Sequence, residues 1–159
     1  MKITIICVGK LKEKFYRDAV MEFEKRLRRY CRLQIIEVAD EKTPEQASEA
    51  EVRQIKEREG ERIQKAMKED GYVIALAIDG ESPDSVEFAD VIQKLGVSGV
   101  SHIYFLIGGS LGLSDEALKR ADRRISFSRM TFPHQLMRVI LCEQIYRAYR
   151  IIHGEPYHK

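Results

Sequence analysis

The chain reads Phe105-Leu106-Ile107-Gly108-Gly109-Ser110-Leu111-Gly112-Leu113-Ser114 where an apolar strand runs into three glycines and then into a helix. Glycines directly after a strand allow positive φ angles and let the backbone approach a ligand closely. The stretch lacks the Gly-Lys-Ser/Thr of a phosphate-binding P-loop and the G-x-G-x-x-G of a dinucleotide-binding fold, and it follows the fourth predicted strand instead of the first. A ligand site and a tight turn without a ligand both remain open on this motif alone.

Strand and helix patterns alternate on both sides of this stretch. We expect strands at residues 2–8, 33–39, 72–78, 102–107 and 124–127. Helical spacing predicts helices at residues 12–30, 45–70, 84–95, from Ser114 onward, and at 135–152. Because parallel neighbouring strands need crossover connections, this alternation predicts an α/β fold: a mostly parallel sheet with helices on both faces, in a single domain over residues 1–159.

Several local signals refine this expectation. Thr43-Pro44-Glu45-Gln46 resembles a capping box with Pro at the first helical position. Gly60 interrupts the helix that follows, so we expect the first half of that helix to be frayed, exposed or loop-like, and we expect a turn at Asp79-Gly80. The last predicted helix carries a broad apolar surface, for which core packing and a dimer interface both remain open. This surface consists of Leu136, Ile140, Leu141, Ile145, Ala148, Tyr149 and Ile152.

Composition places the chain among globular proteins. Its 159 residues are 44% hydrophobic and 33% charged, which is enough for one domain with a sizeable core. No apolar run approaches the roughly 20 residues that span a bilayer, and no secretory leader is recognisable, so we expect neither membrane insertion nor export. Cys7, Cys31 and Cys142 lie too far apart for a zinc motif, and we interpret them as reduced thiols of a cytoplasmic protein.

Charge is strongly segregated along the chain although the net charge is only +2. Residues 1–40 and 119–159 carry net charges of +4 and +6, whereas residues 41–70 and 71–118 carry −2 and −6. The first basic cluster comprises Lys25, Arg26, Arg28, Arg29 and Arg32, and the second comprises Lys119, Arg120, Arg123, Arg124 and Arg129. The two clusters could form one cationic face for RNA phosphates, or each could be only the solvated side of a helix.

Four segments, taken together, carry a resemblance to a known family. They read Val73-Ile74-Ala75-Leu76-Ala77-Ile78-Asp79-Gly80, then Ile107-Gly108-Gly109-Ser110-Leu111-Gly112, then Ser126-Phe127-Ser128-Arg129-Met130-Thr131-Phe132-Pro133-His134, and finally Glu143-Gln144-Ile145-Tyr146-Arg147-Ala148 with the ending His153-Gly154-Glu155-Pro156-Tyr157-His158-Lys159. This combination resembles the ribosomal RNA large subunit methyltransferase H family of SPOUT-class methyltransferases, over the whole length of the chain. In one place the chain departs from the family pattern, because Glu81-Ser82-Pro83-Asp84 replaces a Ser-Ser pair.

The resemblance implies a fold, a cofactor and a substrate. It implies a C-terminal trefoil knot, a homodimer and an S-adenosyl-L-methionine site. It also implies methylation of N3 of a pseudouridine in large-subunit (23S) rRNA, on assembled ribosomes. The family positions that surround the cofactor correspond here to Leu76, Gly108, Phe127, Ser128, Arg129, Met130, Thr131 and Phe132.

The resemblance also narrows the chemistry. Methyl transfer from a sulfonium needs no metal and depends on alignment, so the absence of G-x-S-x-G and H-E-x-x-H motifs is expected. Attack by a ring nitrogen requires loss of its proton, which a nearby base or a stabilising cation assists. Arg138, Tyr157 and His158 are our candidates for these roles, and we expect the C-terminal tail to fold over an active site of its own or of a partner subunit.

Two other functions remain open from the sequence. One is a non-enzymatic ribosome- or RNA-binding protein that uses the basic clusters and no cofactor. The other is a flavodoxin-like nucleotide-binding enzyme, which only the alternation of strands and helices favours.

Overall fold

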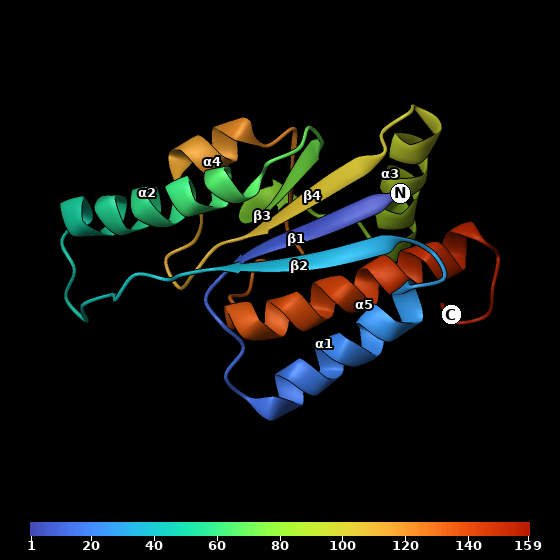
Figure 1. Ribbon diagram of the computed structural model, residues 1–159, viewed down its shortest axis with the longest axis horizontal. Coiled ribbons are helices and arrows are strands. Elements are labelled where there is room, and N and C mark those ends of the chain that lie inside the picture. Colours follow the sequence, from blue (N-terminus) through green and yellow to red (C-terminus); the bar gives the residue numbers. More distant parts are fainter.

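The fold is built on a sheet of five strands in which every neighbouring pair is parallel (Figure 1). The computed structural model describes residues 1–159. The strands are β1 (Lys2–Val8), β2 (Arg32–Val38), β3 (Tyr72–Glu81), β4 (His102–Ile107) and β5 (Arg123–Ile125), in the order β2-β1-β4-β3-β5. The predicted parallel sheet is confirmed, and the trefoil knot stays a prediction.

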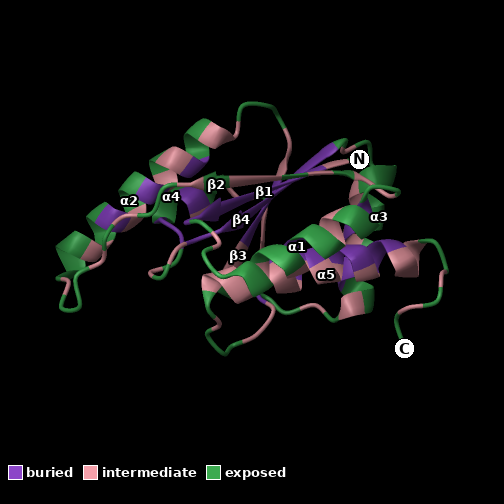
Figure 2. Cartoon of the chain, turned by 60° about the horizontal axis from the view of Figure 1, so that its bottom comes forward, coloured by how far each residue is buried: buried purple, intermediate pink, exposed green.

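Helices cover both faces of this sheet, as predicted (Figures 1 and 2). One face carries α1 (Lys14–Leu27), α3 (Ser85–Val97) and α5 (His134–Ile152), and the other carries α2 (Glu49–Ala66) and α4 (Asp115–Arg120). The central strands β1 and β4 are buried almost throughout, which explains why their sequences are continuous apolar runs instead of alternating ones. No helix is both long and apolar enough to cross a membrane.

The apolar surface of α5 belongs largely to the core of the same chain. Leu141, Ile145, Ala148 and Tyr149 are buried in the cluster that joins α5 to α1, α3 and the sheet. Cys142 is fully buried in the same cluster, as is Cys7, and burial raises the pKa of both thiols. Both cysteines are therefore core residues, and the apolar surface of α5 does not require a dimer to cover it.

Helix α2 departs most from the sequence expectation. It begins at Glu49 behind a capping box, in which the backbone N–H of Glu51 donates to Ser48 Oγ at 3.1 Å, so the box predicted at residues 43–46 is wrong. The helix then continues without interruption through Gly60. Its first half is largely exposed, as expected, but it is regular helix from Glu49 onward and neither frayed nor loop-like. Gly60 is required by packing, because a Cβ there would lie 2.4 Å from Ser114 Oγ at the start of α4.

Strand β3 is longer than predicted. It continues to Glu81 with an irregularity after Leu76, so the turn expected at Asp79-Gly80 is wrong. The extension pairs with the segment after β5, where the backbone N–H of Ser126 donates to the carbonyl of Glu81 at 2.7 Å. A Cβ at Gly80 would lie 2.7 Å from the backbone of residues 124 and 125, which explains the glycine. Strand β5 itself ends at Ile125, two residues earlier than predicted.

Gly60→Ala tests whether the contact between α2 and α4 requires glycine. Helix propensity alone predicts that alanine stabilises α2 by up to about 1 kcal/mol. We expect the opposite, a loss of about 1 to 3 kcal/mol in the free energy of unfolding, because the new Cβ collides with Ser114 and disturbs the N-cap of α4. Urea denaturation measures the difference.

Gly96→Ala is the matched control within a helix. A Cβ at Gly96 would meet only the end of the Met1 side chain, at 3.6 Å. This variant should be as stable as the wild type or slightly more stable. If Gly60→Ala behaves in the same way, close packing between α2 and α4 is not the reason for the glycine.

Candidate active site

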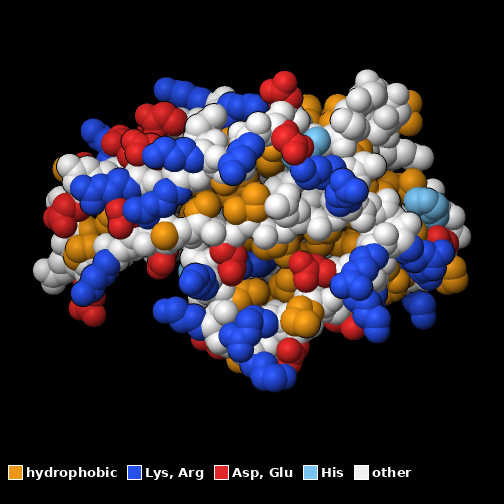
Figure 3. All heavy atoms as spheres, in the orientation of Figure 1, with side chains coloured by type: hydrophobic (Ala, Val, Ile, Leu, Met, Phe, Trp, Pro, Cys, Tyr) orange, Lys and Arg blue, Asp and Glu red, His pale blue; other side chains and the backbone are white.

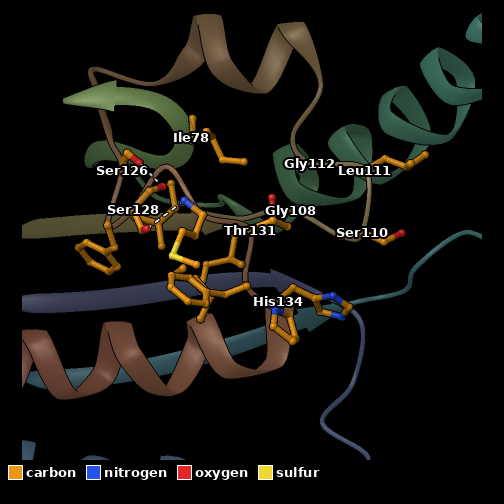
Figure 4. A pocket seen from close by; sticks show the side chains of 18 of the residues that line it. Ile78, Gly108, Ser110, Leu111, Gly112, Ser126, Ser128, Thr131 and His134 are labelled. Atoms are coloured by element: carbon orange, nitrogen blue, oxygen red, sulfur yellow. Dashed lines mark hydrogen bonds between the residues drawn. The ribbon is translucent and has the colours of Figure 1, made fainter. Parts of the chain in front are cut away.

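A cavity of about 600 Å³ opens where β3, β4 and β5 end (Figure 4). Ligands of open parallel sheets bind at this edge, beyond the carboxyl ends of the strands. Three segments form the walls: residues 76–78 in β3, residues 107–112 after β4, and residues 125–134 leading into α5. The first turn of α5 closes one side with His134 and Met137.

The Gly-rich turn after β4 forms one wall with its backbone. A Cβ at Gly108 would lie 2.5 Å from the carbonyl carbon of Gly112, so the two backbones approach each other more closely than any other residue would allow. Gly112 has a φ of +87°, and its N–H donates to the carbonyl of Gly109 at 3.0 Å. The glycines are therefore necessary for the shape of the turn, and they leave its backbone groups at the cavity surface.

The segment before α5 forms a second wall that its own hydrogen bonds hold in place. Ser126 Oγ donates to the carbonyl of Ser128 at 2.9 Å, and the N–H of Met130 donates to Ser128 Oγ at 2.9 Å (Figure 4). Phe127 is anchored against Phe88 of α3, with ring centroids 5.7 Å apart in an edge-to-face arrangement. The loop is thus a shaped surface before any ligand arrives.

The lining of the cavity carries almost no formal charge. It includes no Asp, Glu, Lys or Arg, and His134 is its one imidazole. Burial and the Arg138 guanidinium lower the pKa of His134, while Asp40 acts in the opposite direction, so the ring is neutral at pH 7. No group of three or more His, Cys, Asp or Glu side chains is arranged to hold a metal ion. The cavity can therefore hold a largely apolar ligand and orient it through backbone groups.

Comparison with known proteins identifies the family. A family model described as "Predicted SPOUT methyltransferase" matches residues 1–158. The chain is a SPOUT methyltransferase. It is 64% identical over 159 residues to "Ribosomal RNA large subunit methyltransferase H" of Bifidobacterium adolescentis, covering 100% of both chains. Proteins of the same name from Clostridium kluyveri and Bacillus pumilus are 60% and 57% identical, again over 100% of both chains.

Solved structures share the SPOUT methyltransferase fold at much lower identity. A probable methylase family protein from Haemophilus influenzae has a TM-score of 0.57 and 14% identity, covering 99% of this chain and 70% of that one. TrmJ from Z. mobilis has a TM-score of 0.55 and 11% identity, covering 100% of this chain and 73% of that one. At these identities the likeness concerns the fold alone. Family membership excludes the flavodoxin-like enzyme and the non-enzymatic binding protein.

The cavity of this SPOUT methyltransferase brings together seven of the eight residues that the resemblance assigned to the cofactor: Leu76, Gly108, Phe127, Ser128, Met130, Thr131 and Phe132. Arg129 is the exception, because its side chain is exposed and does not line the cavity. Most of the lining residues that were not predicted from the sequence lie close to predicted ones along the chain, as His134 and Ile125 do. Met137 is separated from them in sequence and joins the wall only because α5 starts there.

Arg138 does not reach the cavity, contrary to the role expected for it. Its side chain is only 1% exposed, and it donates to Glu37 Oε2 at 2.6 Å and to the carbonyl of Gly9 at 3.0 Å. These contacts fasten α5 to β2 and to the loop after β1. Arg138 therefore holds the helix that carries His134 and Met137, and it contacts neither the cavity nor the tail.

The C-terminal tail lies at the other end of α5 (Figure 1). Tyr157 donates its hydroxyl to Glu143 at 3.0 Å and stacks under the Arg147 guanidinium, which also lies 3.2 Å from His158 Nδ1. The tail is thus held by the helix instead of frayed. The tail folds back along α5 as far as Glu143, and none of its residues lines the cavity of the same chain.

The helices that carry parts of the two basic clusters, α1 and α4, lie on opposite faces of the sheet, which argues against one joint cationic face, one of the two alternatives that the sequence left open. The first belongs to the end of α1 and the second to α4 and the segments after it, and these helices pack in different cores. Lys and Arg side chains are spread over the upper left of Figure 3, where α2 and α4 lie, as well as over its lower part, where α1 lies. Within the two clusters, the cations without an ion-pair partner are Lys25, Arg28, Arg32, Lys119, Arg124 and Arg129.

Proposed function

We propose that this methyltransferase transfers the methyl group of S-adenosyl-L-methionine to N3 of a pseudouridine in large-subunit rRNA, in assembled ribosomes of the cytoplasm. The observation that carries the proposal is the cavity at the ends of β3, β4 and β5, with its Gly-rich backbone wall and apolar lining. Full-length relatives at 57–64% identity that bear the name "Ribosomal RNA large subunit methyltransferase H" support the rRNA substrate.

The residues present suit the proposed cofactor. A cavity of about 600 Å³ matches the usual size of a small-molecule site. Leu76 and Phe132 offer apolar contact to a flat adenine ring, and the backbone around Gly108 and residues 127–131 offers hydrogen bonds. When bound, the cofactor supplies an electrophilic methyl group on a sulfonium. The chain's task is then to hold donor and acceptor in line, which shaped walls accomplish without a charged catalytic group.

Deprotonation of the target nitrogen requires groups beyond the cavity walls. Inside the cavity, only the neutral imidazole of His134 can accept a proton. Arg138 is ion-paired with Glu37 and does not line the cavity. Tyr157 and His158 therefore remain as candidates for placing the base and for stabilising the anion that forms when the ring nitrogen loses its proton. Because neither residue lines the cavity of its own chain, we propose a homodimer in which the tail of one chain completes the cavity of the other.

The distribution of charge favours recognition of a large particle. Within each of the two basic clusters only three cations have no ion-pair partner, so each cluster offers only a few phosphate contacts to isolated RNA. The chain is one domain without a separate RNA-binding module. We therefore propose that the shape of the assembled ribosome, and not local RNA sequence, supplies most of the specificity.

Calorimetry tests the cofactor site. The wild-type protein should bind S-adenosyl-L-methionine, and Gly108→Val should lower the affinity by about tenfold or more, because the new side chain collides with the backbone of Gly112 and distorts the turn. Gly96→Ala, remote from the cavity, should bind like the wild type. No binding by the wild type, or unchanged affinity in folded Gly108→Val, would contradict the assignment of the cavity.

Methyl incorporation into two substrates tests the reaction. We expect efficient transfer to assembled ribosomes, little to protein-free rRNA, and a rate that falls with salt as phosphate contacts are screened. Arg28→Glu with Arg32→Glu should weaken ribosome binding without changing cofactor affinity, whereas Lys94→Glu, on α3 and paired with Asp90, should change neither. Equal rates on both substrates would show that the protein reads local RNA structure unaided.

Deletion of Tyr157 to Lys159 tests the tail. The truncated protein should lose methylation and keep its affinity for the cofactor. Mixing it with Gly108→Val should restore about a quarter of the wild-type activity, since random pairing leaves half of the dimers with one complete site. A mixture that stays inactive would show that tail and cavity do not act across the dimer. Full turnover by the truncated protein alone would show that the tail has no catalytic role.

A further inference from the structure

Glu59 on α2 is a buried carboxylate that the proposed reaction does not use. Only 4% of the residue is exposed, and its Oε2 accepts a hydrogen bond from the backbone N–H of Glu41 at 3.0 Å. A Cβ placed on Gly109 would lie 3.1 Å from Oε1 and 3.3 Å from Oε2 of this carboxylate. Gly109 lines the cavity and Glu59 does not, so the carboxylate lies directly behind the backbone wall of the cavity.

Two glycines make this position possible. Gly60 lets α2 approach Ser114 at the start of α4, and this contact brings the neighbouring Glu59 against the Gly-rich turn. Gly109 has no side chain to separate the carboxylate from the turn. Any other residue at either site would push the carboxylate and the cavity wall apart.

The charge of Glu59 has no direct counterion within the chain. The nearest cation acting on it is Arg62, which instead donates to the carbonyl of Ala39 and pairs with Glu41. Burial raises the pKa of Glu59, and the neighbouring carboxylates of Asp40 and Glu41 act in the same direction. A buried carboxylate with no cationic partner is costly to keep, so a positive group on the other side of the thin wall would stabilise it.

We propose that Glu59 is a specificity-determining residue of the cavity, which favours a cationic ligand group bound against the Gly-rich turn over its neutral counterpart. This inference rests on the proposed function, in which that cationic group is the sulfonium of S-adenosyl-L-methionine. After transfer the sulfonium becomes a neutral thioether, so the attraction from Glu59 disappears and the demethylated product binds less tightly than it otherwise would. Glu59 would then bias the cavity toward the charged donor and assist release of the product.

The two ligands provide a direct test, because they differ by one methyl group and one positive charge. We expect Glu59→Gln to lower the affinity for S-adenosyl-L-methionine about fivefold relative to that for S-adenosyl-L-homocysteine, as measured by calorimetry of both ligands. Glutamine keeps a carbonyl oxygen for the N–H of Glu41, so the local geometry is retained. Glu57→Gln, an exposed position on the same helix, is the matched control and should leave the ratio of affinities unchanged.

Each outcome of this experiment is decisive. An equal loss of affinity for both ligands would mean that Glu59 only supports the shape of the turn, and unchanged affinities would mean that it does not act on the cavity. Either result overturns the proposal while leaving the cofactor site intact. If the wild-type protein binds neither ligand, the proposed function fails, and this inference fails with it.

A measurement on the wild-type protein covers the case in which Glu59→Gln does not fold. Binding linkage requires the cationic ligand to lower the pKa of the Glu59 carboxyl further than the neutral ligand does. Carbon-13 NMR titration of the Glu59 side chain in the two complexes measures this difference. Asp40, Glu41 and Arg62 face Glu59 in both complexes, so their contribution cancels. The same pKa in both complexes would overturn the proposal.

Discussion

The close backbone approach within the Gly108–Gly112 turn is the constraint on which the site depends. A side chain at Gly108 would collide with the backbone of Gly112, so only glycine lets β4 end in so tight a turn. The turn provides one wall of the cavity on its open side and meets Glu59 on its other side. It also leads directly to Ser114, which caps α4 and contacts α2. One local geometry therefore couples the cavity to the helices behind it.

Helix α5 divides the proposed chemistry between its two ends. Its first turn borders the cavity, its second turn is fastened to β2 by the pair of buried Arg138 and Glu37, and its second half holds the tail. Arg138 thus keeps the wall of the cavity in place without touching a ligand. The separation of the tail from the cavity of the same chain gives a physical reason for two chains to act together.

The charge of the side chains differs between the cavity lining, the layer behind it and the protein surface. The cavity lining is nearly uncharged, a single carboxylate lies behind its wall, and most of the unpaired cations of the two basic clusters lie at the surface. Because the lining holds no cation, no lining side chain screens the field of Glu59 by its charge. The outer cations are screened by salt and act on a much larger partner.

The sequence by itself determined the features that depend on local pattern. Continuous apolar runs predicted strands 2–8 and 102–107 to the residue, and glycines after a strand marked the turn that lines the cavity. The tertiary structure alone decided what depends on partners distant in the chain. Gly60 suggested a helix break because its reason, contact with Ser114, lies on another helix. Likewise, the burial of Arg138 against Glu37 and of Glu59 behind Gly109 follows from packing between elements, which no local period or turn signal encodes.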